Sequence, residues 1–221
     1  MSVFQTSDLQ ALSDFPKQQD QLAIVERKPL AGADVFFQKM MRTSLRIIGQ
    51  VSKKSSIEDI RYMLEEDISE ELQADPFYAR WVLDMAEVCE TFCDTLGSEA
   101  ISFCLGTERG CRRYHIDNVP MRLLVTYAGQ GTEWIPDEAA DRRALANGAP
   151  NEEIIKDPSK RQFMNIWDIA IFRGGPKGLL HRTPDAALNG PSILMRLDHA
   201  SFWDNILKQQ QNNIQLQTVA A

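Results

Sequence analysis

Two histidines and one aspartate are the residues of this chain whose types and spacing best suit metal chemistry. His115 and Asp117 are two residues apart, so both side chains point to the same face of an extended segment. His181 lies where a later apolar run ends before a Thr-Pro turn. Two imidazoles and one carboxylate on one side of a metal leave the other positions free, as in non-haem Fe(II) oxygenases. The spacing therefore predicts a metal-dependent oxygenase with these three ligands.

Apolar segments typical of β-strands lie around the candidate ligands. Residues 121–127, 168–172 and 192–198 are rich in apolar and β-branched side chains, and turn-forming residues follow the first two. The last segment alternates between two faces, with Ser192, Leu194, Arg196 and Asp198 on one and Ile193, Met195 and Leu197 on the other. The chain has three histidines, and two of them fall at ends of predicted strands, where a double-stranded β-helix holds a metal.

From about residue 22 to residue 203 the chain resembles a bacterial family that carries a domain-of-unknown-function label. The matching segments are Cys-x-x-Tyr-His-Ile-Asp-Asn-Val-Pro, Gly-Thr-Glu-Trp-Ile-Pro and Leu-Leu-His-Arg-Thr-Pro. Their layout is similar to that of the Fe(II)/2-oxoglutarate dioxygenase superfamily. The resemblance implies an α+β protein with a double-stranded β-helix (jelly-roll, cupin-like) core, using Fe(II) and 2-oxoglutarate as cofactors.

Further site residues follow from the same resemblance and from their places in the sequence. The superfamily holds the distal carboxylate of 2-oxoglutarate with a basic residue on the final core strand, which implies this role for Arg196, because a guanidinium matches a carboxylate. Ser192, on the same strand face, could add a hydroxyl group. For a small-molecule substrate we expect Arg112 to attract an anion, Asn118 to orient a ligand and Trp134 to form an apolar wall.

Several alternatives stay open at this stage. A non-catalytic zinc protein could recruit Cys104 or Cys111 beside His115, since zinc accepts Cys, His and Asp ligands alike. His199 could complete a three-histidine site of the kind found in cupin dioxygenases. The fold could also act as an interaction module without metal. Arg196 could simply pair with Asp198, and Trp134 could simply belong to the core.

Composition limits the classes of function. The chain has 221 residues, 43% of them hydrophobic, and a net charge of -7, so it can bury a core but lacks the broad basic surface that binds nucleic acid. The sequence shows neither a secretory signal nor an apolar stretch long enough for a bilayer, so we expect a cytoplasmic protein that does not bind membranes. Walker loops, dinucleotide fingerprints and Gly-x-Ser-x-Gly elbows are absent from the sequence.

The order of patterns along the chain predicts its organisation. We expect a flexible N-terminus over 1–21, a single domain over 22–203 and a C-terminal tail over 204–221. Within the domain, a mainly helical cover (22–97) precedes the β-helix core (98–203), and 136–159 forms a lid or insertion. The helical cover is expected to begin with a short strand at 22–25, followed by helices over about 33–51, from residue 56, and from residue 76 toward residue 96.

Overall fold

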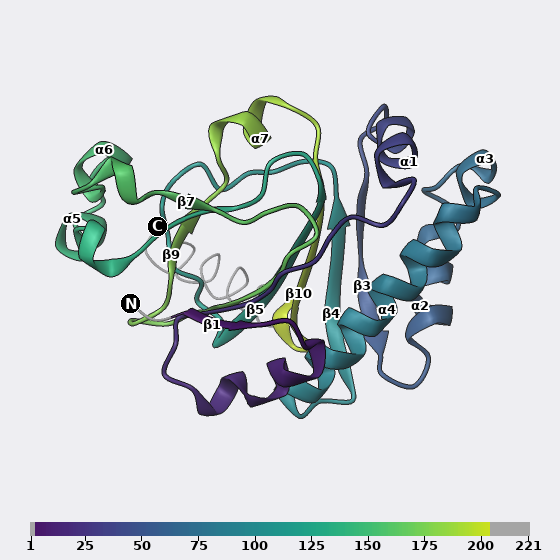
Figure 1. Ribbon diagram of the computed structural model, residues 1–221, viewed down its shortest axis with the longest axis horizontal. Helices are drawn as coiled ribbons and strands as arrows, with labels where there is room; N and C mark the ends of the chain where they lie inside the picture. The colour runs from purple at the N-terminus through teal and green to yellow at the C-terminus, as the bar shows by residue number, and fades with distance from the viewer. Residues whose placement is uncertain (1–2, 204–221) are drawn as a thin grey trace, which may run out of the picture.

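The computed structural model describes residues 3–203, and two β-sheets form its centre (Figure 1). The larger sheet has seven strands in the order β1 (Val3–Thr6), β2 (Leu22–Val25), β8 (Ile169–Arg173), β5 (Met121–Ala128), β10 (Ile193–His199), β4 (Ala100–Gly106) and β3 (Arg46–Ser52). The smaller sheet has three strands in the order β7 (Gln162–Phe163), β6 (Glu133–Ile135) and β9 (Leu180–Arg182). Except for the parallel pair β1 and β2, paired strands run antiparallel.

From β4 onward the chain crosses back and forth between the two sheets. β4, β5, β8 and β10 belong to the larger sheet, and β6, β7 and β9, which come between them, belong to the smaller one. His115, between β4 and β5, adds a further rung to the smaller sheet through an isolated bridge to His181. Two antiparallel sheets connected in this alternating way form a jelly roll. The predicted α+β fold with a double-stranded β-helix core is therefore confirmed.

Both faces of the larger sheet are covered, which explains why its central strands are apolar throughout. In β8, Ile169 and Ile171 pack into the cluster beneath the helices, whereas Ala170 and Phe172 pack between the two sheets. β10 shows the alternation expected from its sequence, because Met195 packs under the helices while the side chains on either side of it face the interior of the jelly roll. The interior face of this sheet carries the polar residues of the site described below.

Helices cover the outer face of the larger sheet (Figure 1). They are α1 (Ala33–Met40), α2 (Ser56–Leu64), α3 (Glu70–Gln73) and α4 (Pro76–Leu96). The longest, α4, begins and ends as its sequence predicts: the Asp75 side chain accepts a hydrogen bond from the backbone of Phe77, and Gly97 adopts the left-handed conformation (φ 61°) that favours glycine. Its apolar side joins an aromatic cluster formed by Phe36, Phe37, Phe77, Trp81, Tyr127 and Trp167.

The N-terminal segment is ordered, which corrects the expectation of a flexible region over 1–21. Residues 3–6 form β1, which pairs with β2, and a 3-10 helix, η1 (Leu9–Lys17), follows. Leu12 and Phe15 of this helix are fully buried. The Arg173 side chain donates hydrogen bonds to three backbone carbonyls of the segment, at Phe15, Gln18 and Asp20. Two apolar anchors in a polar sequence were too sparse to predict this packing.

The expected helix over 33–51 is also wrong in its second half. α1 ends at Met40, and residues 46–52 form β3, an edge strand that pairs with β4. The cover over 22–97 is therefore helical with two strands, β2 and β3. A Cβ atom on Gly49 would lie 2.2 Å from Sδ of Met63 in α2, so β3 and this helix pack closely here.

The insertion predicted over 136–159 folds as four short helices between β6 and β7. They are η2 (Asp137–Ala139), α5 (Arg142–Ala146), α6 (Asn151–Ile154) and η3 (Pro158–Lys160). One more short helix, α7 (Asp185–Asn189), connects β9 to β10. In the part of the chain that the structure describes, no helix has the length and apolar character needed to cross a membrane. The predicted tail over 204–221 lies outside the described residues.

Candidate metal centre

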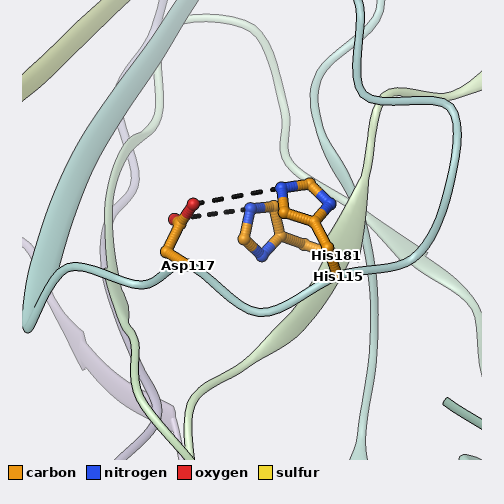
Figure 2. Close-up of side chains that lie close together, drawn as sticks. All are labelled: His115, Asp117 and His181. Atoms are coloured by element: carbon orange, nitrogen blue, oxygen red, sulfur yellow. Dashed lines mark ion pairs between the residues drawn. The ribbon is translucent and has the colours of Figure 1, made fainter. Parts of the chain in front are cut away.

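The smaller sheet brings His115 and His181 together. The backbone N–H of each histidine donates a 3.1 Å hydrogen bond to the carbonyl oxygen of the other, in the antiparallel bridge that extends this sheet. Their ring centroids are 4.4 Å apart. Figure 2 shows both imidazoles turned toward Asp117. Two residues separated by more than sixty positions in the sequence thus form one side of a common site.

Hydrogen bonds from the backbone determine which imidazole nitrogen of each histidine is available. Nδ1 of His115 lies 3.0 Å from the carbonyl oxygen of Arg113, and Nδ1 of His181 lies 3.1 Å from that of Leu179. A carbonyl accepts only, so each neutral ring carries its proton on Nδ1. Nε2 is then unprotonated and has a free lone pair. Histidine binds metals in this state, while the N–H of its other ring nitrogen donates to a carbonyl.

Asp117 supplies the third potential ligand. Its side chain is 3% exposed, and Oδ1 accepts a short hydrogen bond from Nη1 of Arg122. Oδ2 is buried and has no hydrogen-bond donor, although it lies 3.5 Å from Nε2 of His181. Nε2 of His115 is 3.9 Å from Oδ1. The ligand atoms of these three residues lie within 4.8 Å of one another, so small shifts would bring all of them within bonding distance of one ion.

Two glycines of the β8–β9 connection hold the His-x-Asp segment in place. The backbone N–H of Gly175, which has a φ of 75°, donates to the carbonyl oxygen of Asp117 at 2.8 Å. A Cβ atom on Gly174 would lie 1.9 Å from the carbonyl oxygen of Val119 and 2.5 Å from that of Asp117. The Arg-Gly-Gly-Pro stretch between two strands was the available signal in the sequence. It does more than end β8, because it lets the two loops pack backbone against backbone.

A buried network of charges extends from Asp117, and its central residue, Arg122, was not among the site residues predicted from the sequence. Arg122 of β5 donates to Asp117 and, through Nε, to Oδ1 of Asp198 at 2.7 Å. Nε of Arg196 lies 3.1 Å from Oδ2 of Asp198. The charge of Arg122 within an otherwise apolar strand was the available signal. Arg122 orients the metal-ligating carboxylate and keeps its second oxygen turned toward the histidines.

The two histidines titrate differently because their surroundings differ. Burial lowers the pKa of His181 to about 4, even though Asp117 favours the charged form. Burial also lowers the pKa of His115, but hydrogen bonds with the Cys111 side chain and the Arg113 carbonyl outweigh it, and the net shift is upward. At neutral pH, His181 is therefore already neutral and ready to bind a cation.

A cavity of about 380 Å³ lies beside the two imidazoles, a volume in the range of small-molecule sites. Leu45, Leu124 and Leu194 supply its apolar surface. The arginines among its lining residues are Arg46, Arg109, Arg122, Arg182 and Arg196. The arrangement combines a cluster of metal-ligand atoms with a partly apolar, basic chamber.

The other predicted site residues are not all in this cavity. Arg196 lines it. Ser192 is fully buried, donates a long 3.5 Å hydrogen bond to the carbonyl of Thr107, and is not among the residues that line the cavity. Trp134 packs in the core between the sheets. Arg112 and Asn118 are exposed beside the ligand segment, outside the residues that line the cavity.

The residues of the alternative metal sites are placed as follows. Cys104 and Cys111 both line the cavity. A hydrogen bond with His115 lowers the pKa of the Cys111 thiol, whereas burial raises that of Cys104. His199 is exposed at the end of β10, and its Nδ1 pairs with the Ser201 hydroxyl at 2.9 Å. It is not part of the cluster formed by the two other histidines and Asp117.

The segment over 136–159 supports the ligand loop, and the residues that line the cavity come from other parts of the described chain. Asn151 accepts a hydrogen bond from the backbone of Tyr114 at 2.9 Å and donates to the carbonyl of Arg112 at 3.1 Å. The Arg113 side chain donates to the carbonyls of Gly148 and Ala149. These contacts hold the residues immediately before His115, a role that the sequence did not indicate.

Comparisons with known proteins place the chain in a family. No curated protein sequence matches it. Solved structures with similarity include AviO1 from Streptomyces viridochromogenes Tue57 (13% identity, TM-score 0.38, 87% of this chain and 96% of that one). They also include iron-bound EctD from S. alaskensis (18%, 0.41, 87% and 75%) and a Trichoplax adhaerens prolyl hydroxylase in complex with a hypoxia inducible factor peptide fragment (10%, 0.43, 90% and 93%). As its sequence resemblance predicted, and with a match over residues 6–198, this chain belongs to the family described as "Protein of unknown function (DUF1826)".

Proposed function

We propose that this protein is a non-haem Fe(II) oxygenase that uses 2-oxoglutarate to hydroxylate or otherwise oxidise a small molecule. One observation carries the proposal: ligand atoms of His115, Asp117 and His181 converge within 4.8 Å of one another, and Oδ2 of the buried Asp117 carboxylate has no hydrogen-bond donor. Lone pairs repel one another in a buried site unless a cation lies between them. His115, Asp117 and His181 thus fit a divalent metal, and two imidazoles with one carboxylate suit Fe(II).

Bound iron would supply activation of molecular oxygen at the positions that the protein leaves open. The residues of the chain provide the remaining requirements. Arg122 fixes the carboxylate of Asp117, and the two backbone carbonyls fix the tautomers of the histidines. The cavity beside the imidazoles accommodates a small organic molecule, and its leucines limit the access of water to the reacting groups.

Arg196 is the proposed anchor for the distal carboxylate of 2-oxoglutarate. Its guanidinium lies 5.1 Å from the ring centroid of Phe202 and 5.3 Å from that of Trp203, and its Nε lies 3.1 Å from Oδ2 of Asp198. Among the described residues, no acceptor takes a hydrogen bond from its terminal nitrogens. They remain available for a bidentate contact with a carboxylate.

An anaerobic titration tests the proposal. Metal-stripped protein is titrated with Fe(II) and then with 2-oxoglutarate, and the visible charge-transfer band of the iron-bound keto acid is recorded. We expect a band with the wild type and with Arg112→Ala, in which an exposed arginine of the ligand segment is removed. His181→Ala should lose the band through loss of iron, and Arg196→Ala should need much more 2-oxoglutarate. Absence of the band in the wild type at saturating Fe(II) contradicts the proposal.

A non-catalytic zinc protein is the second candidate, because Cys111 contacts His115 at the edge of the metal cluster. The hydrogen bond with His115 lowers the pKa of this thiol, and a thiolate is a strong zinc ligand. A zinc site that uses Cys111 should lose affinity in Cys111→Ser. The Fe(II) and 2-oxoglutarate site should be unaffected by that change, so the two candidates give opposite results in one variant.

A further inference from the structure

The arginines of the cavity differ in whether their charge is neutralised. Arg122 pairs with Asp117 and Asp198, Arg182 with Glu133 and Asp185, and Arg196 with Asp198. Arg46 is exposed at the surface, where solvent screens it. Arg109 is partly buried, and no carboxylate of the described residues forms an ion pair with it. One partly buried positive charge in the cavity therefore lacks a carboxylate partner.

The contacts of Arg109 orient its guanidinium without neutralising it. Nη2 donates to Oγ1 of Thr132 at 2.9 Å, and Nη1 donates to the carbonyl of Gln130 at 3.4 Å. The adjacent carboxylate, Glu108, accepts a hydrogen bond from Ser44 at 2.9 Å. Burial lowers the pKa of Arg109 to about 10, so the group is still a cation at neutral pH. Burying a cation without a partner is unfavourable, which points to a ligand that supplies the missing negative charge.

The position of Arg109 relative to the metal cluster follows from the strand register. Trp134 of β6 lies opposite His181 of β9, and Glu133 lies opposite Arg182. Thr132, which holds Arg109, is two residues before Trp134, so it lies about 7 Å along the sheet from His181 at the usual rise per residue. The leucines of the cavity supply the apolar surface in the same chamber.

We propose that Arg109 binds the carboxylate of the substrate, which is then a small organic acid with an apolar carbon chain. The carboxylate replaces the missing counter-charge, and the chain lies along Leu45, Leu124 and Leu194 toward the metal cluster. A single uncompensated guanidinium matches a monoanionic carboxylate in both charge and geometry. The assignment deepens the proposed oxygenase function and rests on it, since it leaves Arg196 for 2-oxoglutarate.

The experiment compares an acid with an amide of the same shape. Hexanoate and hexanamide are titrated separately into the full, metal-free chain, and binding is measured by calorimetry. We expect hexanoate to bind the wild type at least tenfold more tightly than hexanamide. In Arg109→Gln the side-chain amide still donates to Thr132, but the charge is gone, so hexanoate affinity should fall at least tenfold while hexanamide affinity stays within twofold. Arg61→Gln, a matched change of an exposed arginine on α2 outside the cavity, should behave as the wild type.

Other outcomes overturn the assignment. An acid preference that survives in Arg109→Gln excludes this residue as the anion-binding group. Equal losses for both probes, with a lower melting temperature, indicate a purely structural role. Loss of the Fe(II)/2-oxoglutarate band in Arg109→Gln would assign the residue to the cofactor and not to the substrate. If the band is absent even in the wild type, but hexanoate preference depends on Arg109, the oxygenase proposal fails and the acid site stands.

Discussion

Asp84 and Asp117 are both mostly buried carboxylates beside an arginine, and they lie on opposite sides of the larger sheet. Asp84 belongs to α4 on the helix-covered side, where Oδ1 accepts a 2.5 Å hydrogen bond from Arg27 and Oδ2 accepts one from Tyr127 at 2.8 Å. Asp117 lies inside the jelly roll, where Arg122 donates to one oxygen and the other has no donor. Both oxygens of the Asp84 carboxylate therefore accept hydrogen bonds, whereas one oxygen of the Asp117 carboxylate has no donor.

This difference in hydrogen bonding suggests that Asp84 stabilises the fold and that Asp117 binds a ligand. A carboxylate whose oxygens are all satisfied contributes to the folded state and has no capacity left for a ligand. A buried carboxylate oxygen without a donor costs folding free energy unless a ligand compensates for it. We therefore expect changes at Asp84 to alter the free energy of unfolding and changes at Asp117 to alter metal binding.

The largest effect is expected for Asp117→Asn. The variant keeps the shape of the side chain but loses the negative charge that faces the two histidines. Metal affinity should fall by more than ~100-fold, because the loss of a direct ligand exceeds the 10- to 100-fold effects of outer-shell changes. The free energy of unfolding of the metal-free protein should change by less than ~1 kcal/mol, since Arg122 keeps its bond to Asp198.

Co(II) titration followed by visible absorption measures the affinity, and urea denaturation measures the stability. His199→Ala is the control for general effects of removing a histidine, because His199 is exposed and outside the cluster. An affinity for Co(II) within threefold of the wild type in Asp117→Asn would show that the three residues do not form a metal site.

Asp84→Asn should give the opposite result. The change leaves the charge of Arg27 without its carboxylate, at a site where the two side chains are 19% and 11% exposed. We expect the free energy of unfolding to fall by about 2 kcal/mol, less than for a fully buried pair because some solvent reaches the group. Co(II) affinity should stay within twofold. If Asp84→Asn weakens metal binding as much as Asp117→Asn does, the two clusters are coupled and the division between them fails.

The burial of His181 should make the stability of the metal-free protein depend on pH. Unfolded histidine takes up a proton near its ordinary pKa of 6.5, whereas folded His181 does so only near 4 because of burial. Between these values the unfolded state binds more protons, so the metal-free protein loses stability as the pH falls. From about pH 7 to about pH 5 this loss amounts to about 2 kcal/mol, and above pH 7 the histidine contributes none.

His181→Gln provides the reference for this measurement. Urea denaturation at several pH values yields the stability difference between the wild type and the variant. That difference should change by the stated amount in favour of the variant as the pH is lowered, because glutamine does not titrate. A difference independent of pH over this range would mean that His181 is not held neutral by burial.

The metal cluster and the core strands could be predicted from the sequence, but the polar network around them could not. His115 and Asp117 could be paired because a spacing of two fixes a common face in extended backbone. Arg122 and Arg109 could not be assigned, because their partners lie on other strands or loops and only the register brings them together. Ser192 is fully buried and lies outside the cavity lining, a placement that the alternating pattern of its strand did not indicate.

The errors in the N-terminal half have a similar cause. Residues 46–52 contain as many apolar side chains as an amphipathic helix would, and local pattern alone did not distinguish the two. The pairing partner of β3 is β4, some fifty residues away, so the strand is stabilised by contacts that local sequence does not encode.

The smallest effect is expected for Tyr127→Phe on the helix-covered side. The change removes only the hydroxyl that donates to Asp84, while Arg27 continues to satisfy that carboxylate. We expect the free energy of unfolding to fall by about 1 kcal/mol, the usual net value of one hydrogen bond. Tyr62→Phe removes a hydroxyl from a side chain that is 79% exposed and should cause no measurable change. Co(II) affinity should be the same in both variants, and a change in Tyr127→Phe alone would show that the helix-side network reaches the metal centre through β5.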